Sequence, residues 1–401
     1  MTFVGNVKAT QGVARGLGCV AALLFAGVTM SNAEEPLKPV NPYLELMEEA
    51  AAHGEAHHAI KPALSPVDST VLNGSVPVAE LRSKGFKVVP WTTNDPEKMK
   101  AIIRLGVDGL ISDRPDLLQA ALAEERKVSP EAATKLKNFD AQGHRGGRGL
   151  RPENTLPAFE AGLDNLIDTI ETDTGVTTDG VSLIWHDQFL NPQSCRKADG
   201  SAYTLESRVY IRDISMPEAQ KTFICDKLHF GPDQKNDLEL SPVAVAFAKK
   251  EKLISPYVPT YAEQLFRFAA FYAEYYRSGP GKTNPHAKER AVAADRVHFN
   301  LETKILPDRL PPAVAGNQDV KVPAEMFQNQ TVGPQAFVDA LCGAIKRNHM
   351  ESRADVQSFD YRTLIMIEEQ YPNIPTYYLI DNANILTSEF VPETLRQTPK
   401  K

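Results

Sequence analysis

The chain is short of cysteine, of long apolar runs and of excess positive charge, and each shortage excludes a class of protein. Only 4 cysteines occur in 401 residues and none form a CxxC pair, so a cysteine zinc site is not expected. The 44 basic residues are outnumbered by 51 acidic ones, which argues against non-specific nucleic-acid binding through counterion release. With 42% hydrophobic residues, the chain can still form a large globular core.

The first 33 residues are typical of a secretory signal peptide. Lys8 and Arg15 are their only charges, an apolar run covers 17–30, and small residues stand before Ala33. A membrane anchor is the alternative, but about 14 apolar residues are short of the ~20 that a spanning helix needs. We expect cleavage after Ala33, no stable membrane anchor after it, and a mature chain that is exported to the periplasm or secreted.

Export to an oxidising compartment makes the remaining cysteines candidates for a disulfide. Cys195 and Cys225 lie in one polar, loop-rich stretch and are the expected pair. Cys342 stands in an apolar helical pattern and is expected to be a buried small side chain.

Short β-rich runs alternate with helical patterns, which is typical of βα units around a parallel sheet. The expected strands are 86–91, 107–112, 139–144, 166–173, 297–302, 355–359 and 376–380, with a weaker one near 58–61. Helices are expected after Asp95 and over 115–125, 155–162, 335–346 and 361–370. Eight strands with such helices predict an α/β fold, the (β/α)8 TIM barrel, whose functional side chains lie at the carboxyl ends of the strands.

The alternation of strands and helices is interrupted between Asp187 and Arg296. This stretch holds both cysteines of the expected pair and an aromatic helix around 261–277. We expect an insertion over 188–295 that caps the barrel mouth, with the aromatic side chains of that helix in the core.

The stretch from His144 to Thr155 has the features of a phosphate-binding turn. A strand ends in an imidazole and a guanidinium, and glycines and a capped helix follow, so that Arg145 and backbone N–H groups can surround an anion. A glycine-rich turn with a solvated Arg145 is the alternative.

Carboxylates stand at the ends of two strands. Glu171 and Asp173 are two residues apart and therefore face the same side, where they need a cation between them. Hard oxygen ligands of this kind suit Ca²⁺ or Mg²⁺. Glu302 and Lys304 repeat the alternation on a later strand, and His186 ends another short run. On its own, His186 is more typical of a structural histidine, but its neighbours favour a functional one.

Two further strand ends carry side chains suited to a ligand. Gln357 offers a polar amide, and Trp91 offers an aromatic wall. Ordinary barrel packing is the alternative for both.

Taken together, these residues resemble the signature of the glycerophosphodiester phosphodiesterase family. The first blocks follow in the family's order: His144-Arg145-Gly146, Pro152-Glu153-Asn154-Thr155, Glu171-Thr172-Asp173, Asp179-Gly180 and His186-Asp187. Further matching blocks are Leu301-Glu302-Thr303-Lys304, Gln357-Ser358-Phe359-Asp360, Trp91-Thr92-Thr93-Asn94, Gly106-Val107-Asp108-Gly109 and Ser112-Asp113-Arg114-Pro115. The resemblance implies a TIM-barrel phosphodiesterase.

The order of these blocks departs from the family, because the two blocks that normally end the domain come first here. The simplest account is a circular permutation with strands 6, 7 and 8 before strands 1 to 5, which a closed barrel tolerates because its first and last strands are neighbours. A truncated domain joined to the tail of another is the alternative. The predicted organisation is a signal peptide over 1–33 and one barrel over 34–401, divided into 34–127 (strands 6–8), a joining linker at 128–138, 139–187 (strands 1–2), the insertion 188–295 and 296–401 (strands 3–5).

The resemblance also implies roles for the site residues. Glu171, Asp173 and Glu302 are implied to bind one divalent cation, with Ca²⁺ expected over Mg²⁺. His144 and His186 are implied to act as acid and base on opposite sides of the phosphorus, with their order left open. Contacts with the substrate, direct or through a neighbour, are implied for Arg145, Lys304, Trp91, Glu153 and Gln357.

The implied activity is metal-dependent hydrolysis of a glycerophosphodiester to glycerol 3-phosphate and an alcohol. Two alternatives stay open. One is a phospholipase-D-like action on lysophospholipids, for which an exposed apolar rim at the barrel mouth is expected. The other is an exported, non-catalytic protein that binds metal and phosphate. The expected partner is a small phosphodiester and not a nucleic acid, and the oligomeric state is left open.

Overall fold

The computed structural model describes residues 40–305, 329–388 and 391–398, which belong to one compact unit. The predicted signal peptide, 1–33, lies outside the described residues. The strands are β1 Ala63–Pro66, β2 Gly109–Ser112, β3 Asp140–Gly143, β4 Thr169–Val176, β5 Ser182–Ile184, β6 Arg196–Lys197, β7 Phe223–Ile224, β8 Thr260–Tyr261, β9 His298–Thr303, β10 Ala354–Ser358 and β11 Thr376–Ile380.

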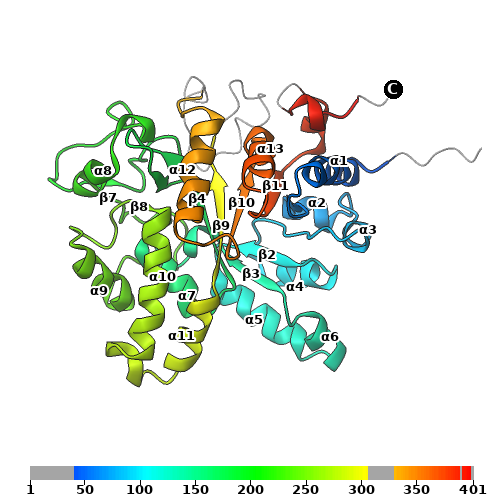
Figure 1. The fold of residues 1–401 in the computed structure, drawn as a ribbon. Helices are drawn as coiled ribbons and strands as arrows, with labels where there is room; N and C mark the ends of the chain where they lie inside the picture. The colour runs from blue at the N-terminus through cyan, green and yellow to red at the C-terminus, as the bar shows by residue number, and fades with distance from the viewer. Residues whose placement is uncertain (1–39, 306–328, 389–390, 399–401) are drawn as a thin grey trace, which may run out of the picture. The chain divides into compact units, whose positions relative to one another are not determined.

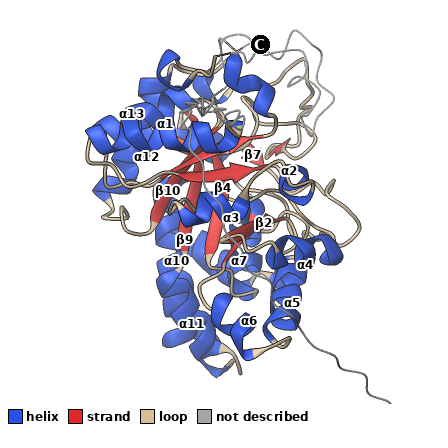
Figure 2. Cartoon of the chain, turned by 90° about the vertical axis from the view of Figure 1, so that its right-hand side faces the viewer, coloured by secondary structure: helices blue, strands red, loops and turns tan. Residues whose placement is uncertain are grey.

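Helices alternate with these strands (Figures 1 and 2). The α-helices are α1 Pro42–Ala56, α2 Asp68–Leu72, α3 Val78–Ser83, α4 Pro96–Arg104, α5 Pro115–Arg126, α6 Pro130–Lys135, α7 Leu156–Asp164, α8 Met216–Thr222, α9 Pro242–Glu251, α10 Ala262–Arg277, α11 Ala287–Arg296, α12 Pro334–Arg347 and α13 Tyr361–Gln370. Short 3₁₀ helices are η1 His144–Gly146, η2 Ile211–Asp213, η3 Leu238–Leu240, η4 Pro280–Thr283, η6 Ala383–Thr387 and η7 Glu393–Leu395. Within these described segments, no helix has both the length and the apolar character to cross a membrane.

Parallel pairing runs through the strands in the order β1-β11-β10-β9-β4-β3-β2. The gap between β2 and β1 is filled by residues 87–93, which hydrogen-bond to both. Leu64 N donates to Lys87 O at 2.9 Å on one side, and Ile111 N donates to Pro90 O at 3.0 Å on the other. The described residues therefore form a closed ring of parallel segments, which confirms the predicted TIM barrel.

An ordinary strand was predicted over 86–91, but this segment joins β1 and the residue after it through isolated bridges at Val88 and Trp91. Pro90 is the physical reason, because it has no N–H to donate and interrupts the ladder. The weak strand predicted near 58–61 was misplaced, since the pairing strand is β1. The residues between α1 and β1 include His58, whose φ is 59°.

The ring holds its strands in the order in which they occur along the chain. The helices pack outside it around one large core that includes Leu64, Phe159, Phe299, Val356 and Tyr378. The circular permutation concerns the order in the family and stays a prediction.

The stretch 188–295 divides into two parts. Cys195 and Cys225 form the expected disulfide and pack with Trp185 and Phe223 in a second, smaller core. This part is attached at the carboxyl end of β4, where β5 pairs with β4 in antiparallel fashion. The aromatic helix predicted in the core is α10, and its Tyr272 is fully buried.

The predicted insertion is too long at its carboxyl end. Helix α10 contacts both α7 and α12, the helices of the neighbouring βα units, and α11 packs against α10 and α7 (Figure 1). Both helices therefore belong to the barrel wall. The part nearer the mouth includes Gln234, whose amide donates to the carbonyl oxygen of Arg148 at 2.8 Å.

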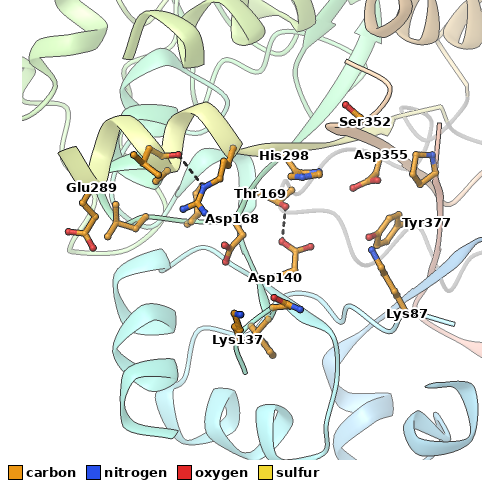
Figure 3. A pocket seen from close by; sticks show the side chains of 18 of the residues that line it. Lys87, Lys137, Asp140, Asp168, Thr169, Glu289, His298, Ser352, Asp355 and Tyr377 are labelled. Atoms are coloured by element: carbon orange, nitrogen blue, oxygen red, sulfur yellow. Dashed lines mark hydrogen bonds between the residues drawn. The ribbon is translucent and has the colours of Figure 1, made fainter. Parts of the chain in front are cut away.

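A pocket of about 1130 Å³ opens at the amino ends of the strands (Figure 3). Its lining includes Asp140, Asp168, His298, Asp355 and Tyr377, each of which lies within one residue of the start of a strand. In a TIM barrel this end serves stability and the opposite end serves chemistry, so this pocket is not the candidate site.

Reduction of the disulfide is expected to lower stability. The disulfide closes a loop between positions 30 apart in sequence. A disulfide across a loop of that size contributes about 2–4 kcal/mol to the free energy of unfolding. The double variant Cys195→Ala/Cys225→Ala should unfold at lower urea than the oxidised wild type. A reductant should lower the wild-type midpoint without changing that of the variant, and equal midpoints for all samples would contradict the assignment.

Candidate functional site

Three buried carboxylates meet at the carboxyl ends of adjacent strands. Glu171 and Asp173 belong to β4 and Glu302 to β9, and Asp173 is the register partner of Glu302. All three are at most 5% exposed. Each offers an oxygen within 4.8 Å of those of the other two. The predicted common face is confirmed, because strand alternation places all three on the inner side of the ring.

These three carboxyl groups repel one another when ionised, so they need nearby positive charge to be ionised together. Burial and the neighbouring Asp173 raise the pKa of Glu171 well above its ordinary value. Burial raises the pKa of Glu302 to about 7, against the opposing charge of Lys304. Burial also opposes the ionisation of Asp173, but Arg145 and Lys304 outweigh it and lower its pKa. Three oxygen donors in this state fit a hard divalent cation, and they form a candidate metal site.

Two basic side chains border the carboxylates. Arg145 Nε lies 3.2 Å from Asp173 Oδ2, and its Nη1 donates to Glu153 Oε2 at 2.6 Å. Lys304 Nζ lies 3.0 Å from Glu302 Oε1 and 3.7 Å from Asp173 Oδ1. Glu153 therefore positions the guanidinium, and both cations face the space that the carboxylates share.

The turn that carries Arg145 depends on glycine. Arg145 has φ 50° and Gly146 has φ 86°. A Cβ on Gly146 would approach the backbone of Ala158 to 2.7 Å, because α7 packs directly on this turn. The glycine thus holds η1 against the helix that follows it, and the backbone N–H of Arg145 donates to Glu171 Oε2 at 3.0 Å. The turn lies beside the carboxylates, and its binding of an anion stays a prediction.

His144 is held by an aspartate on the next strand of the ring. Its Nδ1 lies 2.5 Å from Asp113 Oδ1, and its Nε2 lies 3.9 Å from Glu171 Oε2. Because an ionised carboxylate only accepts, Nδ1 is the donor and Nε2 faces the site. Burial and the Arg148 charge lower the pKa of His144 to about 4. Burial opposes the ionisation of Asp113, yet His144 and Arg148 outweigh it and lower its pKa.

His186, like His144, is held by a carboxylate at its Nδ1. Its Nδ1 lies 2.9 Å from Asp187 Oδ1, and Asn191 donates to the other oxygen of Asp187 at 2.7 Å. Burial, with the charges of Arg145 and Lys304, lowers the pKa of His186. Each histidine therefore has a carboxylate on Nδ1 and its second nitrogen available.

Gln357 connects the site to the interior of the barrel. Its amide nitrogen donates to Glu171 Oε1 at 2.6 Å, and its oxygen accepts from Asn300 at 3.1 Å. Asn300 also donates to Gln142 Oε1 at 3.0 Å, and Gln142 donates to Asp140 Oδ2 at 2.7 Å. A buried polar chain thus crosses the barrel and fixes the orientation of Glu171.

Trp91 lies at the edge of the site. Its indole N–H donates to Ser65 O at 2.9 Å, and its ring packs edge-on against Phe359 at 5.4 Å between centroids. Lys304 Nζ stands 5.6 Å from the centre of the Phe359 ring. Phe359 therefore lies between Trp91 and Lys304, in contact with both.

Several residues that hold the site together have no role predicted from the sequence. Asp113 holds His144, and Asp113 itself accepts hydrogen bonds from Arg148 Nε and from Asn94 Nδ2, both at 2.7 Å. Asn154 donates to Asp173 at 3.1 Å. A signal was available, because Asp113 directly follows β2, the neighbour of the strand that ends before His144.

Comparison with known proteins gives a family match over most of the chain. The model described as "Glycerophosphoryl diester phosphodiesterase family" matches residues 25–117 and 144–397. A glycerophosphodiester phosphodiesterase of Bacillus altitudinis is 43% identical over 63 residues, which are 16% of this chain and 26% of the relative. A lysophospholipase D of Mus musculus is 40% identical over 63 residues, 16% of this chain and 19% of the relative. These matches span about a quarter or less of the curated relatives.

Among solved structures, the chain is similar to a putative glycerophosphoryl diester phosphodiesterase from Silicibacter pomeroyi DSS-3. The sequence identity is 22%, and the match covers 59% of this chain and 63% of that chain with a TM-score of 0.39.

The raised pKa of Glu302 predicts that the metal-free protein loses stability as pH rises. The folded state keeps a proton that the unfolded chain releases between its ordinary pKa of 4.5 and the folded value of about 7. Below this pH range, protonation of Glu302 favours the folded state by about 3 kcal/mol. This contribution to the free energy of unfolding should be lost as the pH rises from 4.5 to about 7. Melting with a chelator at pH 5 and 7.5 should show this loss in the wild type and a smaller one in Glu302→Gln. A pH dependence unchanged in the variant would contradict the assignment.

Proposed function

The chain belongs to the glycerophosphoryl diester phosphodiesterase family, and we propose that it hydrolyses a glycerophosphodiester to glycerol 3-phosphate and an alcohol. The observation that carries the proposal is a group of three buried carboxylates with His144 Nε2 3.9 Å from Glu171 and with His186 near enough for its charge to lower the pKa of Asp173. Each of the two histidines has a carboxylate at Nδ1. The named Bacillus altitudinis relative gives the same substrate class.

A divalent cation held by Glu171, Asp173 and Glu302 would polarise the phosphoryl oxygens as a Lewis acid. We favour Ca²⁺ over Mg²⁺. Carboxylates on two rigid strands cannot readily move into the near-ideal octahedron that Mg²⁺ requires, whereas Ca²⁺ accepts irregular coordination. Arg145 and Lys304 add positive charge where negative charge develops on the phosphoryl group.

His144 and His186 are proposed to move the protons. One Nε2 takes the proton of the attacking oxygen, either water or the neighbouring glycerol hydroxyl, as the new P–O bond forms. The other, in its imidazolium form with a proton on each nitrogen, gives its Nε2 proton to the alcohol oxygen as the bond from that oxygen to phosphorus breaks. Where the glycerol hydroxyl is the attacking group, water then opens the cyclic phosphate to glycerol 3-phosphate, with the two histidines in exchanged roles. Asp113 and Asp187 support this by holding the Nδ1 proton and so fixing the tautomer.

The order of the family blocks supports a circularly permuted barrel, with 34–127 supplying the last three strands of the family order. We also propose export, supported by the leader pattern and by the Cys195–Cys225 disulfide, since such bonds persist in oxidising compartments. The periplasm and the outside of the cell both fit this proposal.

The direct assay is hydrolysis of glycerophosphocholine by the purified protein, with glycerol 3-phosphate detected by a coupled dehydrogenase. Turnover is expected with Ca²⁺ and should be lost with a chelator. Since a relative from Mus musculus is a lysophospholipase D, lysophosphatidylcholine is the second substrate to test. Faster release of choline from the lysolipid would favour that activity, and no turnover of either substrate would refute the proposal.

His144→Ala is expected to lower kcat by about 10²–10⁴-fold while Ca²⁺ binding persists, because a proton-transfer group is lost and the carboxylates remain. Asp113→Asn should also lower kcat, since the Nδ1 proton is no longer held by a charge. The matched control is Asp116→Asn in the same segment, where the carboxylate pairs with Arg114. An unchanged kcat in His144→Ala would rule out its assigned role.

A further inference from the structure

A second group of metal-ligating side chains lies at the contact between α1 and α13. It consists of His53 and His57, one helical turn apart at the end of α1, and Glu369 on α13. The two helices pack together although they lie near opposite ends of the chain (Figures 1 and 2). The candidate active site is built from other strands and turns, so the proposed hydrolysis uses none of these three residues.

The spacing of the donor atoms fits one ion. His53 Nε2 lies 3.6 Å from Glu369 Oε1. The rings of His53 and His57 are 4.9 Å apart between centroids, and one ligand atom from each of the three residues lies within 4.8 Å of the others. Two ligands at about 2.0–2.1 Å from a tetrahedral metal are themselves about 3.3–3.5 Å apart, so small side-chain movements bring all three into coordination.

His53 has a nitrogen that nothing else satisfies. Its side chain is only 12% exposed, and its Nε2 is buried with no hydrogen-bond partner among the described residues. At 3.6 Å, Glu369 is too far for a hydrogen bond. An unpaired imidazole nitrogen is a cost in the metal-free protein that coordination removes.

The local field also favours a cation. His53 and His57 stand at the carboxyl end of α1, and Glu369 stands one residue before the end of α13. Each helix end carries a partial negative charge from its unpaired carbonyl groups. Two such ends and a carboxylate therefore attract positive charge to the same place.

We propose that His53, His57 and Glu369 bind a transition-metal ion of the Zn²⁺ class and so tie α1 to α13. Two imidazoles and one carboxylate suit Zn²⁺, whereas Ca²⁺ prefers oxygen ligands only. The exposed His57 and Glu369 leave the ion open to water as a fourth ligand. The role of the ion is a clamp that holds the first described helix against the carboxyl-terminal part of the barrel.

The test compares Zn²⁺ binding and melting of the wild type with His57→Gln. Both proteins keep the carboxylate site, so excess Ca²⁺ is present and only the difference between them counts. The wild type should bind one more Zn²⁺ per chain by calorimetry, and Zn²⁺ should raise its Tm by on the order of 3 °C more than that of the variant. Glu369→Gln should weaken binding in the same direction.

His58→Asn is the matched control. His58 is the next histidine, is exposed, and lies outside the group of three, and Asn accepts its positive φ. This variant should bind Zn²⁺ as the wild type does. Circular dichroism without metal should be the same for all variants, because the replaced side chains are exposed. Equal stoichiometry and equal Tm shifts in wild type and His57→Gln, or an equal loss in His58→Asn, would overturn the proposal.

Discussion

Repulsion among three buried carboxylates is the constraint on which the candidate site depends. Glu171, Asp173 and Glu302 are placed by two paired strands, so they cannot move apart without disturbing the barrel. Arg145 and Lys304 supply part of the positive charge they need, and protonation supplies more where burial raises the carboxyl pKa. A divalent cation would satisfy the same need and would leave the two basic side chains able to meet a phosphate. The same need for positive charge would account for both the proposed metal site and the proposed anion binding beside it.

The closed ring of strands fixes the positions of the side chains around these carboxylates. The segment 87–93 closes the ring between β1 and β2. The register of β2 with β3 brings Asp113, which follows β2, next to His144, which follows β3. On the inner side, the amides of Gln142, Asn300 and Gln357 form a buried chain that ends on Glu171. Every polar group in that chain needs its partner, because an unpaired amide in the core costs about 1–3 kcal/mol. The site is therefore positioned by hydrogen bonds that extend through the barrel as well as by its own residues.

Local patterns were enough to predict most of the strands, the barrel, the common face of the carboxylates and the disulfide. Alternation along one strand determines which side chains share a face, and this needs no knowledge of neighbours. What the sequence did not reveal depends on pairing between distant segments. The contact of Asp113 with His144, the amide chain through Asn300 and the approach of Glu369 to His53 each require the register of the ring. The predicted insertion extends too far because the alternation of strands and helices is interrupted over 188–295, and the contacts of α10 with α7 and α12 depend on the folded barrel.

The most direct test of the central claim is a crystal structure of the protein with Mn²⁺ in place of the native ion, using anomalous scattering to locate it. The account predicts an anomalous peak between Glu171, Asp173 and Glu302, with their oxygens about 2.0–2.6 Å from it. Density without a peak there, with the three carboxylates paired only to Arg145 and Lys304, would contradict it.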